Sequence, residues 1–163
     1  MAGRKLDLAK EATKTTLALL REKDSFGVLA FNTTFEWAVK IAEVQNKDEM
    51  RKAVDGIWGT GNTSIYPAMQ EAYRQLRTMP GDNRHIILLS DGQTPRDNFQ
   101  ALASDMLKDK ITISTVALTA VSDRELLENI ANWGGGRAYY VDNPQGIPEI
   151  FREDTELAAG RRP

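Results

Sequence analysis

Two short polar segments, residues 59–64 and 90–93, carry the side chains best suited to chemistry. The first, Gly-Thr-Gly-Asn-Thr-Ser, offers hydroxyl groups, and the second, Ser-Asp-Gly-Gln, offers the carboxylate of Asp91. Hydroxyl and carboxylate oxygens suit a hard cation such as Mg²⁺, with water completing an octahedral shell. Thr63 and Asp91 are therefore candidate metal ligands, although two groups are too few for a tight site. The simpler alternatives are a helix N-cap for Thr63 and a plain turn for residues 90–92.

An enzymatic interpretation of the same segments has less support. Residues 59–64 resemble the flavin-phosphate loop of flavodoxins, but such a loop follows a buried strand, whereas residues 51–58 have helical spacing. No Gly-Lys-Ser/Thr follows, which excludes a P-loop. His85, the single histidine, lies at the start of the strand that ends at Asp91, and about six strand residues separate the two by roughly 15–20 Å. Asp97 offers Asp91 an acid–base partner, but no other feature supports this pair, so the chain is not predicted to be an enzyme.

The strand that leads to Asp91 is the clearest element in the sequence. Residues 86–89, Ile-Ile-Leu-Leu, form an apolar run without polar alternation, which is typical of a strand buried on both faces of a parallel sheet. The run ends at Ser-Asp-Gly, three residues that favour a turn. Because ligands of open α/β sheets bind beyond the carboxyl ends of the strands, Asp91 is predicted to lie at a binding edge.

The remaining elements follow from hydrophobic spacing. Three- and four-residue steps predict helices, continuous or alternating apolar runs predict strands, and a polar pair at residues 32–33 predicts a hairpin turn. The expected helices are residues 6–22, 47–58, about 64–76, 99–107, a segment between a capping box at Ser122 and Glu125 and the glycines 134–136, and 147–159; the expected strands are residues 26–31, 34–41, 86–90, 111–118 and 137–141. This order predicts a Rossmann-like α/β fold in one domain of residues 1–163. Its sheet is mixed and mostly parallel, with one antiparallel edge strand and helices on both faces.

Composition limits the possible functions. The chain has 163 residues, enough for one substantial core, with 21 basic and 23 acidic residues and a net charge of −2. This balance gives no support for a nucleic-acid partner. The absence of cysteine excludes disulfides, thiolate metal sites and cysteine nucleophiles. No apolar run approaches the roughly 18 residues of a membrane span, and no signal-peptide core follows the N-terminus, so a soluble piece without direct membrane contact is expected.

Five segments of the sequence match one known pattern in the right order. They are residues 61–69 (Gly-Asn-Thr-Ser-Ile-Tyr-Pro-Ala-Met), residues 86–92 (Ile-Ile-Leu-Leu-Ser-Asp-Gly), the start of the first helix at residues 3–10, the hairpin at residues 26–41, and residues 116–118. Together they resemble the von Willebrand factor type A domain family. This family holds a divalent cation, such as Mg²⁺, at a metal-ion-dependent adhesion site, where a carboxylate from a protein partner completes the coordination. The resemblance implies that Thr63 and Asp91 are metal ligands. The flanking residues implied to contact the partner are Asn62, Ser64, Gly92 and Gln93.

One part of the family pattern does not appear in the sequence. The family begins with a buried strand that ends in Asp-x-Ser-x-Ser and supplies three metal ligands, whereas here the first-helix pattern already begins at residue 3. We therefore expect weak or absent Mg²⁺ binding by this chain. About six buried apolar side chains, at ~1.5–3 kcal/mol each, would also be missing, a sum comparable to the net stability of a domain. The expected remedy is closure of the flanking strands or self-association that fills the gap.

These observations leave three candidate functions. The first is an adhesion-type protein-interaction module with a remnant, impaired metal site. The second is a flavin- or phosphate-binding α/β enzyme built on residues 59–64, and the third is a structural remnant without activity. Residues 147–155 are similar to a bacterial subgroup in which the domain belongs to larger, often membrane-anchored proteins. A membrane-anchored or envelope-associated parent protein is therefore a further expectation.

Overall fold

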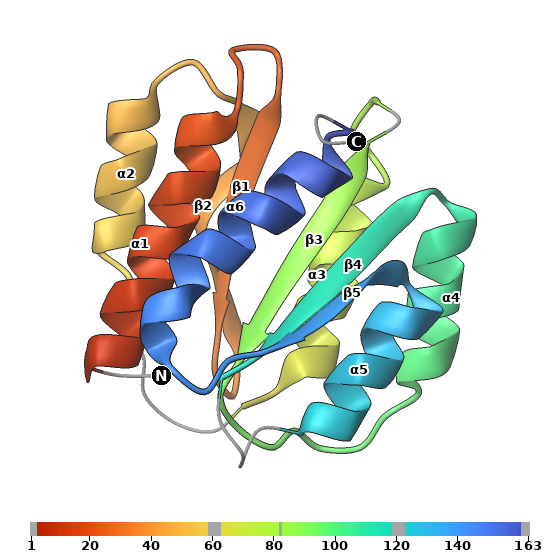
Figure 1. Cartoon of the computed structure of the whole chain (residues 1–163). Helices are drawn as coiled ribbons and strands as arrows, with labels where there is room; N and C mark the ends of the chain where they lie inside the picture. Colours follow the sequence, from red (N-terminus) through yellow and green to blue (C-terminus); the bar gives the residue numbers. More distant parts are fainter. Residues whose placement is uncertain (1–2, 59–62, 82, 119–122, 161–163) are drawn as a thin grey trace. The chain divides into compact units, whose positions relative to one another are not determined.

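The computed structural model describes residues 3–58, 63–81, 83–118 and 123–160 (Figure 1). The chain forms two compact units. Unit 1 comprises Met1–Gly61 with Pro144–Pro163, and unit 2 comprises Asn62–Asn143. Unit 1 contains an antiparallel two-stranded sheet and unit 2 a parallel three-stranded sheet.

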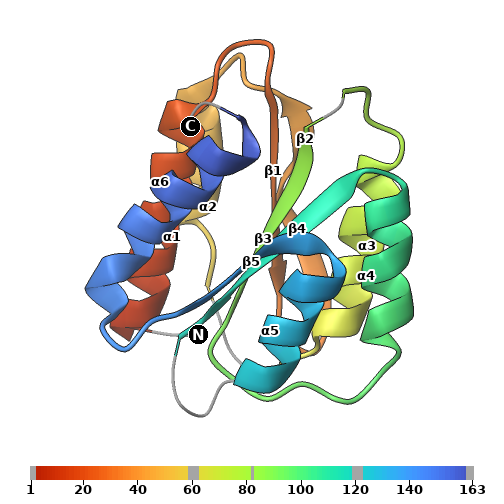
Figure 2. The same cartoon turned by 45° about the vertical axis from the view of Figure 1, so that its right-hand side comes forward.

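Unit 1 combines a β-hairpin with helices. Its elements are α1 (Gly3–Leu19), β1 (Ser25–Phe31), β2 (Phe35–Glu43), α2 (Lys47–Asp55), the short 3₁₀ turn η1 (Pro144–Gly146) and α6 (Ile147–Ala158). Helix α1 contacts both α2 and α6, and α2 contacts β2; α1 and α6 run side by side in Figures 1 and 2. A buried cluster joins the hairpin to α1 and α2, formed by Leu17, Phe26, Val39, Val44 and Val54. This cluster is the apolar core that stabilises the hairpin.

Strands β1 and β2 form the antiparallel hairpin that the sequence predicts. In the turn, the N–H of Asn32 donates to the carbonyl of Thr34 (2.8 Å), and the Asn32 side chain accepts from the Thr34 N–H (3.0 Å). The register shifts next to Gly27. A Cβ at this position would lie 2.6 Å from Cγ1 and 3.1 Å from Cα of Ile41, so the two strands approach this closely because residue 27 has no side chain.

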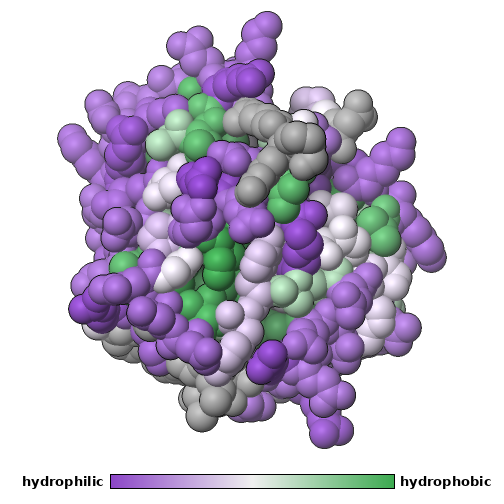
Figure 3. Space-filling model, viewed as in Figure 1, coloured by the Kyte–Doolittle hydropathy of each residue, from purple (hydrophilic) through white to green (hydrophobic). Residues whose placement is uncertain are grey.

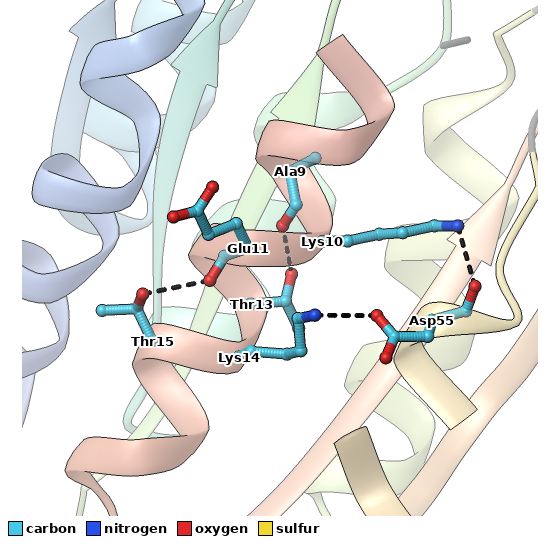
Figure 4. Close-up of polar contacts among 7 residues, drawn as sticks. All are labelled: Ala9, Lys10, Glu11, Thr13, Lys14, Thr15 and Asp55. Atoms are coloured by element: carbon cyan, nitrogen blue, oxygen red, sulfur yellow. Dashed lines mark hydrogen bonds and ion pairs between the residues drawn. The ribbon is translucent and has the colours of Figure 1, made fainter. Parts of the chain in front are cut away.

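Lysine side chains connect the helices of unit 1 (Figure 4). Lys10 Nζ donates to the backbone carbonyl of Asp55 (2.9 Å), and Lys14 Nζ donates to the Asp55 carboxylate (2.8 Å). On the second helix, Lys47 Nζ donates to the carbonyl of Leu20 (2.8 Å). Asp55 ends α2 and Leu20 follows the last residue of α1. Each contact therefore places a positive charge at the C-terminal end of a helix, where the helix dipole is negative.

Unit 2 is a parallel sheet with helices packed along it (Figure 2). Its elements are α3 (Ile65–Leu76), β3 (Arg84–Ser90), α4 (Phe99–Lys108), β4 (Ile111–Ala117), α5 (Arg124–Trp133) and β5 (Gly135–Tyr140). The strand order is β3-β4-β5. Helix α5 contacts β4 and β5, and α4 contacts β4, α3 and α5. Every residue of β4 except Thr112 is buried, so this central strand forms the middle of the core.

Arg84, the first residue of β3, binds the C-terminal ends of two helices of unit 2. Its Nη1 donates to the carbonyl of Leu76, the last residue of α3 (3.2 Å), and its Nη2 donates to the carbonyl of Asp109, the C-cap of α4. The Nε atom is buried and has no hydrogen-bond partner within the described part of the chain. The guanidinium thus donates to carbonyls at the ends of two helices; the Leu76 carbonyl also accepts from the N–H of Met79 (3.1 Å).

Arg84→Met is expected to lower the free energy of unfolding by about 1–3 kcal/mol, because two helix-terminal carbonyls lose their charged donor. The matched control is Arg74→Met. Arg74 is 69% exposed and pairs with Glu71 on the same helix (2.8 Å), so its loss is expected to change stability by less than about 0.5 kcal/mol. Urea unfolding of both variants measures the difference. Equal midpoints for the two variants would contradict the proposed role of Arg84.

The predicted α/β class, with parallel strands and an antiparallel hairpin strand, is confirmed. The described strands form two sheets rather than the one mixed sheet that the sequence predicts, and several element boundaries differ. The first helix spans Gly3–Leu19 rather than residues 6–22, because the chain turns where the N–H of Arg21 donates to the Asp24 carboxylate (2.8 Å). The strand predicted at 137–141 begins at Gly135. Ser122 of the predicted capping box lies outside the described residues, and the N-cap of α5 is Asp123. The single domain of residues 1–163 stays a prediction.

One face of the molecule is mainly polar. Hydrophilic side chains cover most of the face seen in Figure 3. Large apolar side chains that are exposed include Phe35, Trp58 and Leu107. Single side chains of this kind are ordinary on protein surfaces. None of the helices in the described ranges is long and apolar enough to span a bilayer.

Candidate metal centre

Asp91 lies at the carboxyl end of β3, directly after the last strand residue, as the sequence predicts. The carbonyl of Ser90 accepts from the N–H of Leu118 (3.0 Å), which continues the parallel pairing of β3 with β4 to the end of the strand. The carbonyl of Gly92 accepts from the N–H of Asp123 (3.3 Å) just before α5. The loop that carries the half-buried Asp91 is therefore held by backbone hydrogen bonds at both of its neighbours.

Thr63 lies against the same loop, from a segment that precedes α3. A Cβ placed on Gly92 would stand 2.9 Å from Oγ1 and 3.7 Å from Cβ of Thr63. Glycine is therefore the residue that allows the Thr63 hydroxyl to lie next to the backbone beside Asp91. The simple alternative, Thr63 as N-cap, does not hold, because the N-cap of α3 is Ser64 with φ −125° and ψ 94°. The hydroxyl of Thr63 is thus placed at the loop rather than on the helix end.

The hydroxyl of Thr94 connects the two segments, and the sequence analysis does not predict this role. Thr94 Oγ1 accepts a hydrogen bond from the N–H of Ile65, the first residue of α3 (3.0 Å). The one signal in the sequence was a hydroxyl residue that extends the polar segment 90–93. A bond between residues 29 positions apart cannot be read from local spacing.

The structure brings most of the predicted site residues to one edge of unit 2. They are Thr63, Ser64, Asp91 and Gly92, which are half-buried, and Gln93, which is exposed. Asn62 lies outside the described residues. His85 lies at the other end of β3, where its Nδ1 is 2.6 Å from the hydroxyl of Thr112, its partner in the β3–β4 register. This position fits a structural role for the histidine and no role beside Asp91.

The phosphate-loop alternative lacks its supporting strand. Helix α2 ends at Asp55, and residues 56–58, the last described before the loop, are not in a strand. Residues 59–62 of the loop lie outside the described part of the chain. A dinucleotide- or flavin-type cradle needs a buried strand that leads directly into the loop.

Thr63 and Asp91 fit a divalent cation in the type of donor but not in number. A hydroxyl and a carboxylate are hard oxygen ligands, which suit Mg²⁺. Within the described ranges, no group of three or more histidine, aspartate or glutamate side chains is arranged to hold a metal.

A second candidate is a groove of about 610 Å³ between α3 and α4, lined by residues that include Tyr73 and Arg77. Burial, followed by a hydrogen bond to the Asp109 carboxylate, raises the pKa of Tyr73 above its ordinary value. Arg77 lies over the Tyr73 ring (5.2 Å to the centroid) and pairs with Asp109 (3.4 Å). Because these polar groups bind one another, this cluster is a structural network, and the edge with Asp91 is the better candidate site.

The parallel sheet has helices packed along it, and the loops that carry Thr63 and Asp91 lie at its carboxyl edge. Comparison with known proteins agrees with this arrangement. The chain belongs to the von Willebrand factor type A domain family, which residues 1–153 match. A curated relative from Synechocystis sp., named uncharacterized protein sll0103, is 28% identical over 160 residues, which cover 94% of this chain and 37% of the relative. The chain therefore spans well under half the length of that relative.

Solved structures give the same fold. The von Willebrand factor type A structure from Catenulispora acidiphila has a TM-score of 0.83 and 24% identity, and the match covers 96% of this chain and 39% of that one. Proximal thread matrix protein 1 from the mussel byssus, in a structure with a zinc-occupied MIDAS motif, has a TM-score of 0.79 and 19% identity. That match covers 93% of this chain and 40% of the byssus protein.

Proposed function

We propose that this chain is a protein-interaction module in which Thr63 and Asp91 hold a divalent cation and a carboxylate of a protein partner completes the coordination. One observation carries the proposal: the Thr63 hydroxyl lies against Gly92, the residue next to Asp91, at the carboxyl edge of the β3-β4-β5 sheet. We assign Mg²⁺ as the cation because both donors are hard oxygens. The zinc-occupied MIDAS motif of the byssus protein supports metal binding on this fold.

The same edge is suited to a partner. Gln93 is exposed, and Ser64 and Gly92 are half-buried beside the two proposed ligands. We propose that these three residues, together with Asn62, contact the partner around the cation. A cation with few protein ligands keeps coordination positions that a carboxylate from outside can fill, and the added negative charge strengthens its binding.

We propose that affinity for Mg²⁺ alone is weak in this chain, on the order of 10⁻³ M, because the two assigned ligands contribute one carboxylate and one hydroxyl. The partner's carboxylate and the cation would then each raise the affinity for the other, since binding linkage is reciprocal. The chain acts in this proposal by binding and has no catalytic role.

The proposal extends to the number of domains, the oligomeric state and the parent protein. The family match spans both compact units, which supports one domain of residues 1–163. Self-association through its sheets and an envelope-associated parent protein are also proposed, and light scattering tests the first of these. The flavin- or phosphate-binding alternative has less support, because α2 and residues 56–58, rather than a strand, directly precede the loop at residues 59–64. A flavin absorption spectrum of the purified protein would be the evidence for it.

A pair of short peptides tests the proposed function. A terminally blocked peptide with one aspartate, and its asparagine counterpart, are titrated into the protein at saturating Mg²⁺ while amide NMR signals are followed. The aspartate peptide is expected to shift the signals of Thr63, Asp91 and Gly92, and EDTA is expected to reverse the shifts. Equal binding of both peptides, or binding that persists in EDTA, would overturn the proposal.

A further inference from the structure

Thr94 provides a cap for α3 from a distant part of the chain. The first N–H groups of a helix have no partner within the helix, and a side chain at the N-cap usually supplies one. Here the N-cap, Ser64, makes no side-chain capping bond with the described residues. The hydroxyl of Thr94 instead accepts from the N–H of Ile65 at 3.0 Å. Ile65 is fully buried, so this bond fixes the first residue of the helix.

This hydrogen bond connects the two segments that carry the proposed metal ligands. Thr63 is two residues before Ile65, and Asp91 is three residues before Thr94. The Thr63 hydroxyl also lies so close to Gly92 that a Cβ there would stand 2.9 Å from its Oγ1, so the same two segments lie near each other at a second point. The hydrogen bond from Ile65 to Thr94 is therefore the interaction that holds the two segments together near the place where Thr63 approaches Gly92.

We propose that Thr94 is a positioning residue that holds Thr63 and Asp91 at the spacing one cation requires, and that it is not itself a ligand. The inference rests on the proposed function of Thr63 and Asp91. Mg²⁺ demands short, nearly octahedral distances, so loss of the connection between its ligands reduces affinity even when both ligands remain. Groups that orient metal ligands typically change affinity by about 10–100-fold when they are removed.

Two substitutions at one position test the inference. Thr94→Val keeps the shape of the side chain but removes the oxygen, and Thr94→Ser keeps the oxygen. In Thr94→Val, the Ile65 amide is expected to exchange its hydrogen faster in the metal-free protein, and Mg²⁺ affinity is expected to fall about tenfold or more. In Thr94→Ser, the exchange rate of the Ile65 amide and the affinity for Mg²⁺ are both expected to stay close to those of the wild-type protein. Amide exchange and NMR titration with Mg²⁺ supply the two readouts.

The matched control is Thr78→Val, which removes an exposed hydroxyl that donates to the Gln75 carbonyl (2.7 Å) beyond the other end of α3. This variant is expected to leave the hydrogen-exchange rate of the Ile65 amide and the affinity for Mg²⁺ unchanged. If the wild-type protein binds Mg²⁺ at Thr63 and Asp91 and Thr94→Val binds it equally well, the inference is wrong while the proposed function stands. If the wild-type protein shows no Mg²⁺ binding at these residues, both are wrong.

Discussion

Asp91→Asn is expected to abolish the Mg²⁺-dependent binding of the aspartate peptide while leaving the fold intact. Asparagine has nearly the shape of aspartate but carries no charge, and a neutral amide oxygen is a poor replacement for the carboxylate of a site with one anionic ligand. The loss is expected to exceed the roughly 10–100-fold typical of groups that only orient a ligand. Peptide titration at saturating Mg²⁺ measures it, and unfolding by urea checks the fold.

The matched control is Asp97→Asn, which makes the same change of charge six residues further along. Asp97 is exposed, and its carboxylate accepts from the N–H of Asn98 (2.8 Å), away from the proposed ligands in the sequence. Peptide binding is expected to persist in this variant. If Asp97→Asn weakens binding as much as Asp91→Asn, general surface charge rather than metal ligation attracts the peptide, and the assigned role of Asp91 is wrong.

Gly136→Ala is expected to produce the largest loss of stability, about 3 kcal/mol or more, because the new Cβ meets backbone atoms that cannot move aside. It would lie 2.0 Å from the carbonyl oxygen and 2.4 Å from the carbonyl carbon of Ile113, and 2.8 Å from the N of Ser114. These atoms belong to β4, the central strand of the unit 2 sheet. Relief requires β5 to move away from β4, which breaks their parallel pairing.

Gly146→Ala is the control for this substitution. A Cβ there would meet no atom within 4 Å, and the φ of −78° is one that alanine readily adopts. Urea unfolding is expected to give a midpoint close to that of the wild-type protein for Gly146→Ala and a much lower one for Gly136→Ala. Similar midpoints for the two variants would show that β4 and β5 do not approach as closely as described.

The glycines 134–136 show how far hydrophobic spacing predicts this fold. The sequence correctly indicates a helix end here, since α5 finishes at Trp133 with Gly134 as its C-cap. It does not indicate that Gly135, with φ of +73°, and Gly136 already belong to β5. The need for glycine at residue 136 comes from the close approach to Ile113, a residue more than twenty positions away in the sequence. Local patterns predict which elements form, whereas their ends depend on such contacts.

In the candidate site, too, local sequence patterns predict some features, while others depend on contacts between distant residues. The placement of Asp91 was predictable, because a buried parallel strand must end at a sheet edge and the apolar run stops directly before this residue. The approach of Thr63 to the same loop was available through the family resemblance but not from spacing. The bond from Ile65 to Thr94 had no local signal, because a threonine that accepts from a distant helix end looks like any polar loop residue. Sequence patterns thus located the proposed ligands and missed the residue that connects them.

Metal binding at Thr63 and Asp91 can be tested through the paramagnetic broadening of amide NMR signals by substoichiometric Mn²⁺, a cation that also binds hard oxygen ligands. Broadening detects even weak, rapidly exchanging binding and reports where the ion resides. Selective broadening is expected at Thr63, Asp91 and Gly92; excess Mg²⁺ is expected to reverse it, and Asp91→Asn to remove it. Broadening absent from these residues, or centred on another part of the chain, would contradict metal binding at Thr63 and Asp91.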